Sequence, residues 1–455
     1  MKYINNLICL WRNNFSHINN NSSQISQTDT ESRMSSHLLL ALLTFINILN
    51  FVDRQLIASF ANDIKPDLDL NNFQYSLLTG FSFILFYSIM GLFVGTLADR
   101  LHRPRLLAFG LGLWSLLTAF SGMARSFTAM LIPRMLIGVG ESVATPTSLS
   151  ILSDRYNKAE LGLVSAIYYL GVPLGIAASF LIAGYIGPLI GWRTCFLLIG
   201  GVGVVIALFL LFLPETPRMG LSSSSQNIEK MPFKEIISNI LKLIRQYSSL
   251  RYVIIAGVMF HVMLGAAAFE QLWLVQERGF EKSDILVKSG WIAVFAGILG
   301  NLSGGILGDI WQKKTNSGRP MFLFWAFLIL LPIGLMYRLA DPNTPIFWVG
   351  MFFAYFQLGL VYGPSFSTVQ ELSPPRYKAT LIAFYILTMN LIGLGVGGTL
   401  AGIMADVLVN NNVAEPYTVT LIVFSVVASS SIPLLYLSGK RFFVDRVNLL
   451  NSLNK

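Results

Sequence analysis

The stretch 95–105, GTLADRLHRPR, lies between two long apolar runs and decides the fold. It joins the acidic Asp99 to a cluster of arginines that includes Arg100 and Arg103. A second, weaker copy stands at 305–315, GILGDIWQKKT. At one constant offset, the matched positions are Gly95 with Gly305, Asp99 with Asp309 and Arg103 with Lys313. A charged turn repeated once in each half of the chain predicts two related halves, and internal repeats of this kind are typical of secondary transporters.

The composition indicates the same class. Of 455 residues, 54% are hydrophobic and only 12% are charged, whereas a soluble domain averages about 25% charged residues. One water-soluble core cannot hide so much hydrocarbon, but runs of about 20 apolar residues are long enough to cross a bilayer as helices. The net charge of +9 comes from bases in the loops, as membrane topology demands, so it does not indicate a nucleic-acid partner.

Twelve apolar runs follow one another and lack the alternating pattern of a membrane β-barrel. They contain many Gly and Pro residues, which membrane helices tolerate because neighbouring helices satisfy the freed backbone groups. We therefore predict an all-α membrane protein with twelve transmembrane helices in two pseudo-symmetric six-helix bundles. The predicted spans are 38–60, 73–97, 105–124, 127–152, 162–187, 194–213, 251–276, 288–310, 320–340, 345–367, 378–404 and 416–438.

These spans divide the chain into parts. Residues 1–37 are polar and rich in Asn and Ser, which predicts a disordered tail. The two bundles occupy 38–213 and 251–438, and 439–455 form a second tail. Most Lys and Arg residues fall in loops on the side of both tails, so the positive-inside rule predicts that both termini are cytoplasmic. We expect a monomeric, multi-pass protein of a bacterial inner membrane.

The linker 214–250 contains a helical pattern. Its apolar residues Ile237, Ile240, Leu241 and Ile244 fall at helical spacing, with basic residues between them. This pattern predicts an amphipathic helix, which either lies on the inner membrane surface or packs on a bundle as a linker.

Several motifs resemble those of the major facilitator superfamily, over roughly residues 38–440. Besides the doubled turn, they are Arg134-x-x-x-Gly138-x-Gly140, Gly171-Val-Pro173-Leu-Gly175, Gly191-Trp192-Arg193 and PETPR at 214–218. Four further motifs resemble those of the Spinster-like branch. They are Asn50-Phe-Val-Asp53-Arg54, Gly138-Val-Gly-Glu141, Glu371-Leu-Ser-Pro-Pro375 and Asn390-Leu-Ile-Gly-Leu-Gly395. The resemblance implies proton-linked or facilitated transport, of lysolipids or sphingoid phosphates in some members, through a cavity lined by spans one, four, seven and ten.

The chain departs from this family pattern at three places. A base usually follows Asp154 by a few positions, but Leu161 stands near that place and Lys158 is the nearest substitute. The second turn lacks a base directly after Asp309, so we expect that copy to hold its bundle more weakly. Glu270 places a charge in the seventh span, where an apolar or aromatic residue is expected.

Charged residues inside the spans are the candidates for function, because each costs at least ~2.5 kcal/mol in hydrocarbon. Asp53 and Arg54 are adjacent, and neighbours in sequence do not face each other on a helix, so we expect them to have different partners. Helix geometry places Asp53, Arg134 and Glu270 at a similar depth, roughly 10 Å from the outer ends of their spans. We therefore predict that these three residues form an outer charged cluster.

Glu141 is the candidate for proton coupling. It follows Arg134 by two helical turns on nearly the same face and lies near mid-membrane, at about the depth of His261. A desolvated carboxylate that pairs reversibly with an arginine changes its proton affinity, as coupling requires. The alternatives are that Asp53 anchors Arg134 structurally, that Glu141 makes a fixed hydrogen bond, and that His261 is a packed histidine.

Arg54 is expected either to bind an anionic head group or to pair with a carboxylate. We also predict that Tyr87, Tyr169 and Asn390 contact the substrate. Two substrate classes remain open, an amphiphile such as a lysophospholipid or sphingoid phosphate and a small organic anion such as a sugar acid. The predicted cytoplasmic gate consists of Gly95, Asp99, Arg100, Arg103, Asp309 and Lys313.

The sequence does not favour an enzyme, because it lacks a GxSxG elbow, an HExxH helix, a Walker loop and a CxxC pair. The two cysteines, Cys9 and Cys195, stand in unlike surroundings and indicate no metal site. We expect no cofactor. The repeated halves favour a carrier whose two bundles rock against each other. They do not favour a channel or a receptor.

Overall fold

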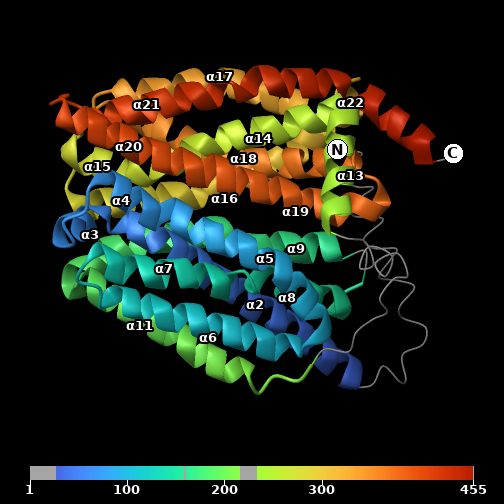
Figure 1. Cartoon of the computed structure of the whole chain (residues 1–455), viewed down its shortest axis with the longest axis horizontal. Coiled ribbons are helices and arrows are strands. Elements are labelled where there is room, and N and C mark those ends of the chain that lie inside the picture. Colours follow the sequence, from blue (N-terminus) through green and yellow to red (C-terminus); the bar gives the residue numbers. More distant parts are fainter. Residues whose placement is uncertain (1–26, 158–159, 216–232, 454–455) are drawn as a thin grey trace.

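The computed structural model describes residues 27–157, 160–215 and 233–453, and these are almost entirely helical. The helices run along one long axis in two bundles, with the N-terminal half below the C-terminal half in Figure 1. The N-terminal half comprises α2 (Gln27–Ser59), α3 (Ala61–Asp67), α4 (Asn72–Ser76), η1 (Leu77–Phe81), α5 (Ser82–Arg100), α6 (Arg103–Gly122), α7 (Phe127–Glu141), α8 (Ala144–Arg155), α9 (Leu161–Tyr169), α10 (Gly171–Leu181), η2 (Ile182–Ile186) and α11 (Gly187–Leu210).

The C-terminal half repeats this plan after the linker helix α13 (Phe233–Gln246). It comprises α14 (Ser248–Ala266), η3 (Ala267–Phe269), α15 (Glu270–Gln276), α16 (Lys282–Lys314), α17 (Arg319–Leu339), α18 (Pro345–Glu371), η4 (Pro375–Tyr377), α19 (Lys378–Thr388), η5 (Met389–Val396), α20 (Gly397–Asn410), α21 (Pro416–Ser429) and α22 (Ser431–Leu453).

Among the described residues, 11 helical stretches are long and apolar enough to cross a membrane. One of them, Leu163–Leu210, has 48 residues and at 1.5 Å per residue is about 72 Å long, more than twice the hydrocarbon thickness. It is interrupted at Gly191, whose φ of 77° lies in the region that favours glycine. Because this stretch therefore holds two spans, the described helices are consistent with the predicted twelve.

Local sequence signals set the ends of these helices. The Ser126 side chain accepts a hydrogen bond from the Ala129 backbone at the start of α7, and Glu281 caps α16 by accepting from Ser283 and Asp284. Proline occupies the first or second position of α6, α17, α18 and α21, where its missing N–H costs nothing.

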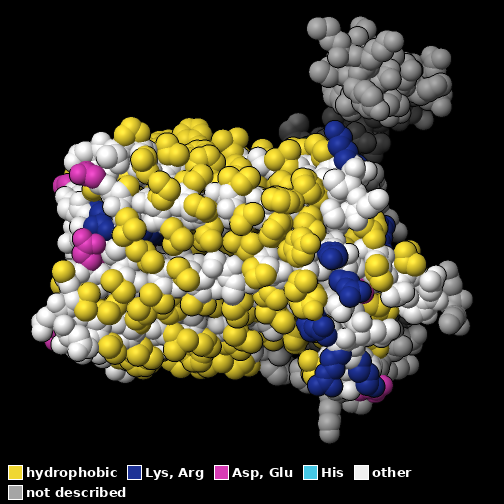
Figure 2. Space-filling model, turned by 90° about the horizontal axis from the view of Figure 1, so that it is seen from above, with side chains coloured by type: hydrophobic (Ala, Val, Ile, Leu, Met, Phe, Trp, Pro, Cys, Tyr) yellow, Lys and Arg dark blue, Asp and Glu magenta, His cyan; other side chains and the backbone are white. Residues whose placement is uncertain are grey.

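The charged residues distinguish the two ends of the molecule. We call the end where α2 begins and α22 finishes the terminal end, and the opposite end, where α3 and α15 lie, the far end. Figure 2 shows Lys and Arg side chains gathered at the terminal end of the visible face and a broad hydrophobic surface along the bundles. Such a surface is what a protein needs in order to face lipid hydrocarbon.

Three π-helical turns, η1, η2 and η5, occur in the second, fifth and eleventh spans, where the bundles meet. Gly184 of η2 shows how closely the bundles approach, because an added Cβ would lie 2.7 Å from the Val287 side chain of α16. Such turns are frequent at functional sites, since they re-aim side chains within a helix.

The structure corrects the prediction for one segment and separates two predicted arrangements for another. The predicted tail 439–455 is helical to Leu453, and Asp445 within it accepts a 2.6 Å hydrogen bond from the Ser249 backbone. In the linker helix α13, Ile240 is fully buried and Asn239 donates to Tyr377. Of the two arrangements predicted for the linker helix, these contacts favour packing on the C-terminal bundle.

Candidate functional site

Arg54 and Glu141 form an ion pair between α2 and α7. The distance between Arg54 Nε and Glu141 Oε2 is 2.6 Å. The Glu141 side chain is completely buried, whereas 23% of the Arg54 side chain is exposed. Glu141 Oε1 is buried without a hydrogen-bond partner among the described residues. The arginine therefore keeps some exposed side-chain surface, and its carboxylate partner has none.

Asp53 and Arg134 form a second, sealed pair beside the first. Their closest charged atoms are 3.6 Å apart and both side chains are at most 2% exposed. Thr118 donates a 2.6 Å hydrogen bond to Asp53 Oδ2, and the Arg134 guanidinium also donates to the backbone carbonyls of Leu78 and Asp53 at 3.4 Å. A pair so enclosed positions α2 against α7 and offers no surface to a ligand.

The two pairs follow from helix geometry. Asp53 and Arg54 are adjacent on α2 and point in different directions, while Arg134 and Glu141 stand two turns apart on one face of α7. Each residue of α2 therefore meets a different residue of α7. The prediction that Asp53 and Arg54 have different partners is confirmed.

Three aromatic rings surround the Arg54 guanidinium. Its Cζ lies 5.0 Å from the Phe51 ring centroid, 4.9 Å from that of Phe83 and 4.5 Å from that of Tyr87. Cation–π contacts of this kind hold a guanidinium in place without neutralising it. The structure thus places Tyr87 beside Arg54, and both are residues that we predict to contact the substrate.

Tyr169 and Asn390, the other two predicted substrate residues, make no hydrogen bond or ring contact with Arg54 in the part of the chain that the structure describes. Tyr169 is 41% exposed at the end of α9, and its ring packs edge-on against Tyr168. Asn390 is half-buried in η5, in the opposite bundle.

Glu270 does not join the Asp53–Arg134 pair, and the predicted outer cluster of three is wrong. Glu270 Oε1 accepts a 2.8 Å hydrogen bond from Tyr337 and lies 3.6 Å from Arg338 Nη1, both in α17 of its own bundle. Depth along a helix fixes neither the direction of a side chain nor its partner. The sequence therefore did not predict that Glu270 has its partners in its own bundle.

His261 is buried in α14 of the C-terminal bundle. Its Nδ1 lies 2.8 Å from the Gly257 carbonyl and its Nε2 3.4 Å from the Tyr362 hydroxyl. No ion pair involves it among the described residues. This geometry favours the packed-histidine alternative over a role in proton transfer with Glu141.

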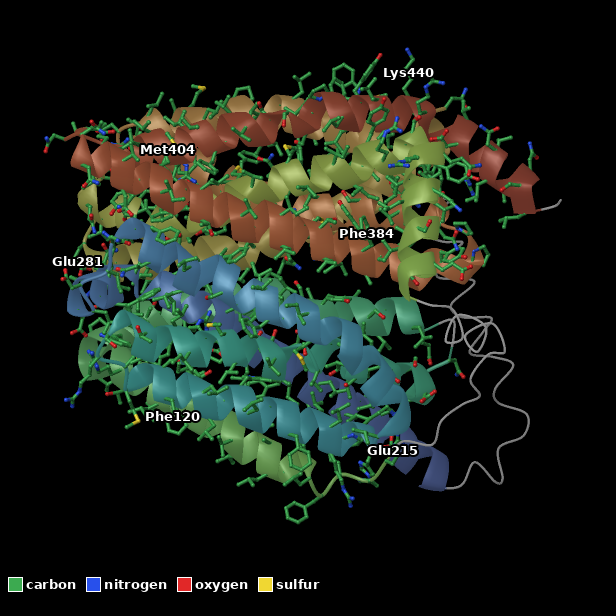
Figure 3. All side chains as sticks on the ribbon, viewed as in Figure 1. Phe120, Glu215, Glu281, Phe384, Met404 and Lys440 are labelled. Carbon is green, nitrogen blue, oxygen red and sulfur yellow. The ribbon has the colours of Figure 1, made fainter. Side chains whose placement is uncertain are left out.

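Arg103, in the predicted gate, holds the terminal end of the N-terminal bundle together. It is 2% exposed, and its guanidinium lies 2.5 Å from Asp154 and 2.9 Å from Glu215; Figure 3 labels Glu215 at this end. Partial burial raises the pKa of Glu215, but hydrogen bonds from the Arg103 side chain and backbone lower it by more. The net result is a pKa below the ordinary value of 4.5. Helix α5 contains Gly95 and runs to Arg100, but the side chains of Asp99 and Arg100, like Lys158, lie outside the described residues.

Arg319 takes the corresponding place in the C-terminal bundle, which corrects the assignment of Lys313. Arg319 Nε lies 2.7 Å from Asp309, and its Nη1 pairs with Glu371 at the end of α18. Lys313 is exposed and makes no ion pair with a described residue. Arg103 and Arg319 each begin a helix and precede a proline. Each binds an acid near the end of the following membrane span, Asp154 in α8 and Glu371 in α18. The second turn therefore does have a base, and it is more distant in sequence than expected.

The two bundles are joined by hydrogen bonds at the far end. Asp406 of α20 accepts 2.8 Å hydrogen bonds from the backbones of Asn72 and Phe73 in α4, and Lys282 lies 2.6 Å from Asp63. Within the described ranges, the hydrogen bonds between the bundles all lie at this end. No sequence motif marks this set, because its residues lie in different helices that are far apart in the sequence or too short to show a pattern.

Known proteins match most of the chain. Residues 43–398 match the Major Facilitator Superfamily. An MFS-type efflux pump of Mycolicibacterium smegmatis is 27% identical over 380 residues, which cover 82% of this chain and 85% of that protein. Protein spinster of Drosophila melanogaster is 26% identical, over 83% of this chain and 63% of that protein. The hexuronate transporter of Bacillus subtilis is 25% identical, over 81% of this chain and 87% of that protein.

A solved structure has the same fold. It is that of a bacterial homolog of the human lysosomal transporter Spinster in an inward-facing and unoccupied conformation. The TM-score is 0.73 at 22% sequence identity, over 91% of this chain and 98% of that chain. At this level of identity the likeness concerns the fold alone.

Proposed function

This chain belongs to the Major Facilitator Superfamily, and on that premise we propose that it carries an amphiphilic anion, such as a lysophospholipid or sphingoid phosphate, in a proton-coupled cycle. That it is a membrane transporter and not an enzyme follows from the family. Its similarity to protein spinster and the site around Arg54 support the proposed substrate class.

The main support for this proposal is the unequal exposure of Arg54 and Glu141. Arg54 is accessible over 23% of its side chain and is held by aromatic rings, so it is placed to bind an anionic head group. The Asp53–Arg134 pair is sealed and supports α2 behind it. Arg54 is therefore the ligand-binding cation of the site and Arg134 the structural one.

Proton coupling follows from competition for Arg54. While Glu141 is ionised it neutralises Arg54, and an incoming anion meets a buried carboxylate of like charge. A proton taken up by Glu141 leaves Arg54 without a counter-charge, and the anionic head group replaces the carboxylate. Release of the anion restores the ion pair and expels the proton.

Alternating access requires one end to be closed while the other is open. The hydrogen bonds at the far end hold the bundles together there, as in a carrier open at its terminal end. The Lys and Arg residues of the terminal end support a cytoplasmic position for it and for both termini, in a bacterial inner membrane.

A transport assay in proteoliposomes tests this function. Uptake of a radiolabelled lysophospholipid under an imposed proton gradient is compared with uptake of a hexuronate, for wild type, Arg54→Gln and Arg125→Gln. Arg125 is an exposed loop arginine that serves as the matched control. We expect gradient-driven lysophospholipid uptake, its loss in Arg54→Gln and its retention in Arg125→Gln. Uptake that is equal in all three proteins would contradict the role of Arg54.

A small organic anion is the second candidate substrate. The hexuronate transporter of Bacillus subtilis matches this chain over nearly as much of its length, and a sugar acid also offers a carboxylate to Arg54. Hexuronate uptake without lysophospholipid uptake would select this alternative.

A further inference from the structure

A cavity of about 90 Å³ lies inside the C-terminal bundle, between α14, α17, α18 and the α21–α22 pair. It is separate from Arg54 and Glu141, which belong to the other bundle. Its walls are mostly apolar, with Phe260, Met263, Leu331 and Ile432 among them, and Glu270 and Arg338 supply charge. A cavity of this composition resembles small-molecule sites, which combine apolar walls with a few polar anchors.

Arg338 is the anchor that points to a ligand. The residue is 6% exposed, and its Cζ lies 4.6 Å from the Trp273 ring centroid and 4.4 Å from that of Tyr337. Its Nη1 is buried and has no hydrogen-bond partner among the described residues. Glu270 is 3.6 Å away, beyond hydrogen-bonding distance. The rings thus fix a guanidinium that forms an ion pair with Glu270 but whose Nη1 makes no hydrogen bond to a described residue.

The size and chemistry of the cavity specify the ligand. The Nη1 group of Arg338, which makes no hydrogen bond to a described residue, can donate to a carboxylate, and the apolar walls match an alkyl chain. A cavity of about 150 Å³ holds the six carbons of benzene, so 90 Å³ suits an alkyl part of about three carbons. We propose that this cavity is a second binding site, which takes a short-chain monocarboxylate with its carboxylate on Arg338.

Glu270 limits the affinity of this site. Its carboxylate lies beside the same guanidinium and repels a bound anion. Tyr337, which donates to Glu270, keeps that carboxylate in place. Removing the charge of Glu270 should therefore strengthen anion binding. If the Glu270–Arg338 pair were purely structural, no anion would bind at Arg338 with or without that charge.

Calorimetric titration of butyrate into the full-length protein in nanodiscs tests the proposal. We expect one site per protein, at least tenfold weaker binding of acetate, which lacks the chain, and at least tenfold weaker binding of octanoate, which exceeds the cavity. Equal binding of the three acids would overturn the assignment, because it would show that the cavity walls play no part.

Substitutions supply the decisive comparison. Glu270→Gln should tighten butyrate binding about tenfold. Gly334→Leu should abolish it, because Gly334 lines the cavity one turn before Arg338 and an added Cβ there meets no atom within 4 Å. Gly201→Leu is the matched control, since Gly201 also has open space around its Cβ position but lies in α11 of the other bundle.

Arg54→Gln separates this site from the proposed transport site. It should leave butyrate binding unchanged even where it abolishes uptake. Loss of butyrate binding in Arg54→Gln, or no change in both Glu270→Gln and Gly334→Leu, would overturn the proposal. Both of the latter variants retain Arg338, so a folding failure caused by its loss does not obscure the result.

Discussion

Arg54 and Glu141 are 2.6 Å apart, but only Arg54 has an exposed surface, 23% of its side chain against none for Glu141. An ion pair with one partly exposed partner differs from a fully buried one, because the exposed partner can interact with a second group without the pair being fully broken. The neighbouring Asp53–Arg134 pair has no such surface.

Glu141→Gln should remove coupling and preserve exchange. The amide cannot ionise, so Arg54 remains available to the anion whether or not a proton gradient is present. We expect uptake driven by a proton gradient to fall at least tenfold, while counterflow of the same substrate stays within about twofold of wild type. Proteoliposome assays of both modes measure this, and equal losses in the two modes would assign Glu141 a structural role.

Arg134→Gln should destabilise the protein by about 3–5 kcal/mol, because it leaves the Asp53 carboxylate buried without a counter-charge. The double variant Asp53→Asn/Arg134→Gln removes both charges and should recover much of that loss. Thermal unfolding in one detergent measures both. A double variant less stable than the single one would show that the pair is not coupled as the structure indicates.

Asp406→Asn should favour opening of the far end. Asp406 accepts from two backbone N–H groups of the other bundle, and hydrogen bonds to a charged acceptor contribute roughly 1.5–3 kcal/mol each. We expect at least a tenfold increase in the labelling rate of a cysteine placed at Ser76. Asp284→Asn is the control, since Asp284 pairs with Lys288 of its own helix and should leave labelling unchanged.

Arg319→Gln should weaken the terminal end of the C-terminal bundle more than Lys313→Gln does. Arg319 binds Asp309 and Glu371, whereas Lys313 is exposed and unpaired among the described residues. We expect a loss of about 1.5–3 kcal/mol for Arg319→Gln and less than about 0.5 kcal/mol for Lys313→Gln. Equal losses in thermal unfolding would restore Lys313 as the counterpart of Arg103.

The contribution of Glu215 should depend on pH in one direction only. Its folded-state pKa lies below 4.5 because hydrogen bonds from Arg103 outweigh partial burial. A depressed carboxyl pKa stabilises the folded state above the unfolded pKa, and this stability is lost as pH falls through the folded pKa. The melting-temperature difference between wild type and Glu215→Gln should therefore be constant from pH 6 to 8 and shrink below about pH 4.5.

Glu235→Gln controls for general effects of acid, because Glu235 is an exposed acid of α13 with no ion pair to a described residue. Its melting-temperature difference from wild type should stay near zero throughout. A difference for Glu215→Gln that grows as the pH falls would contradict the sign of the pKa shift.

The class of protein and its bundle plan were determined by the sequence. Apolar length and the repeated charged turn predict membrane helices in two related halves, because the bilayer allows few other ways to satisfy the backbone. Separate partners for Asp53 and Arg54 also followed from sequence alone, since adjacent helical residues point in different directions.

Only the tertiary structure decided which charges meet. Glu270 and Arg338 are distant in sequence, and their contact depends on the direction in which α15 and α17 face each other. Arg319 was missed because it follows Asp309 by ten residues, so no constant offset from Asp99 and Arg103 finds it. Helix period and depth give a position along the axis, but the rotation of each helix against its neighbours comes from packing, and that rotation determines the ion pairs and the cavity.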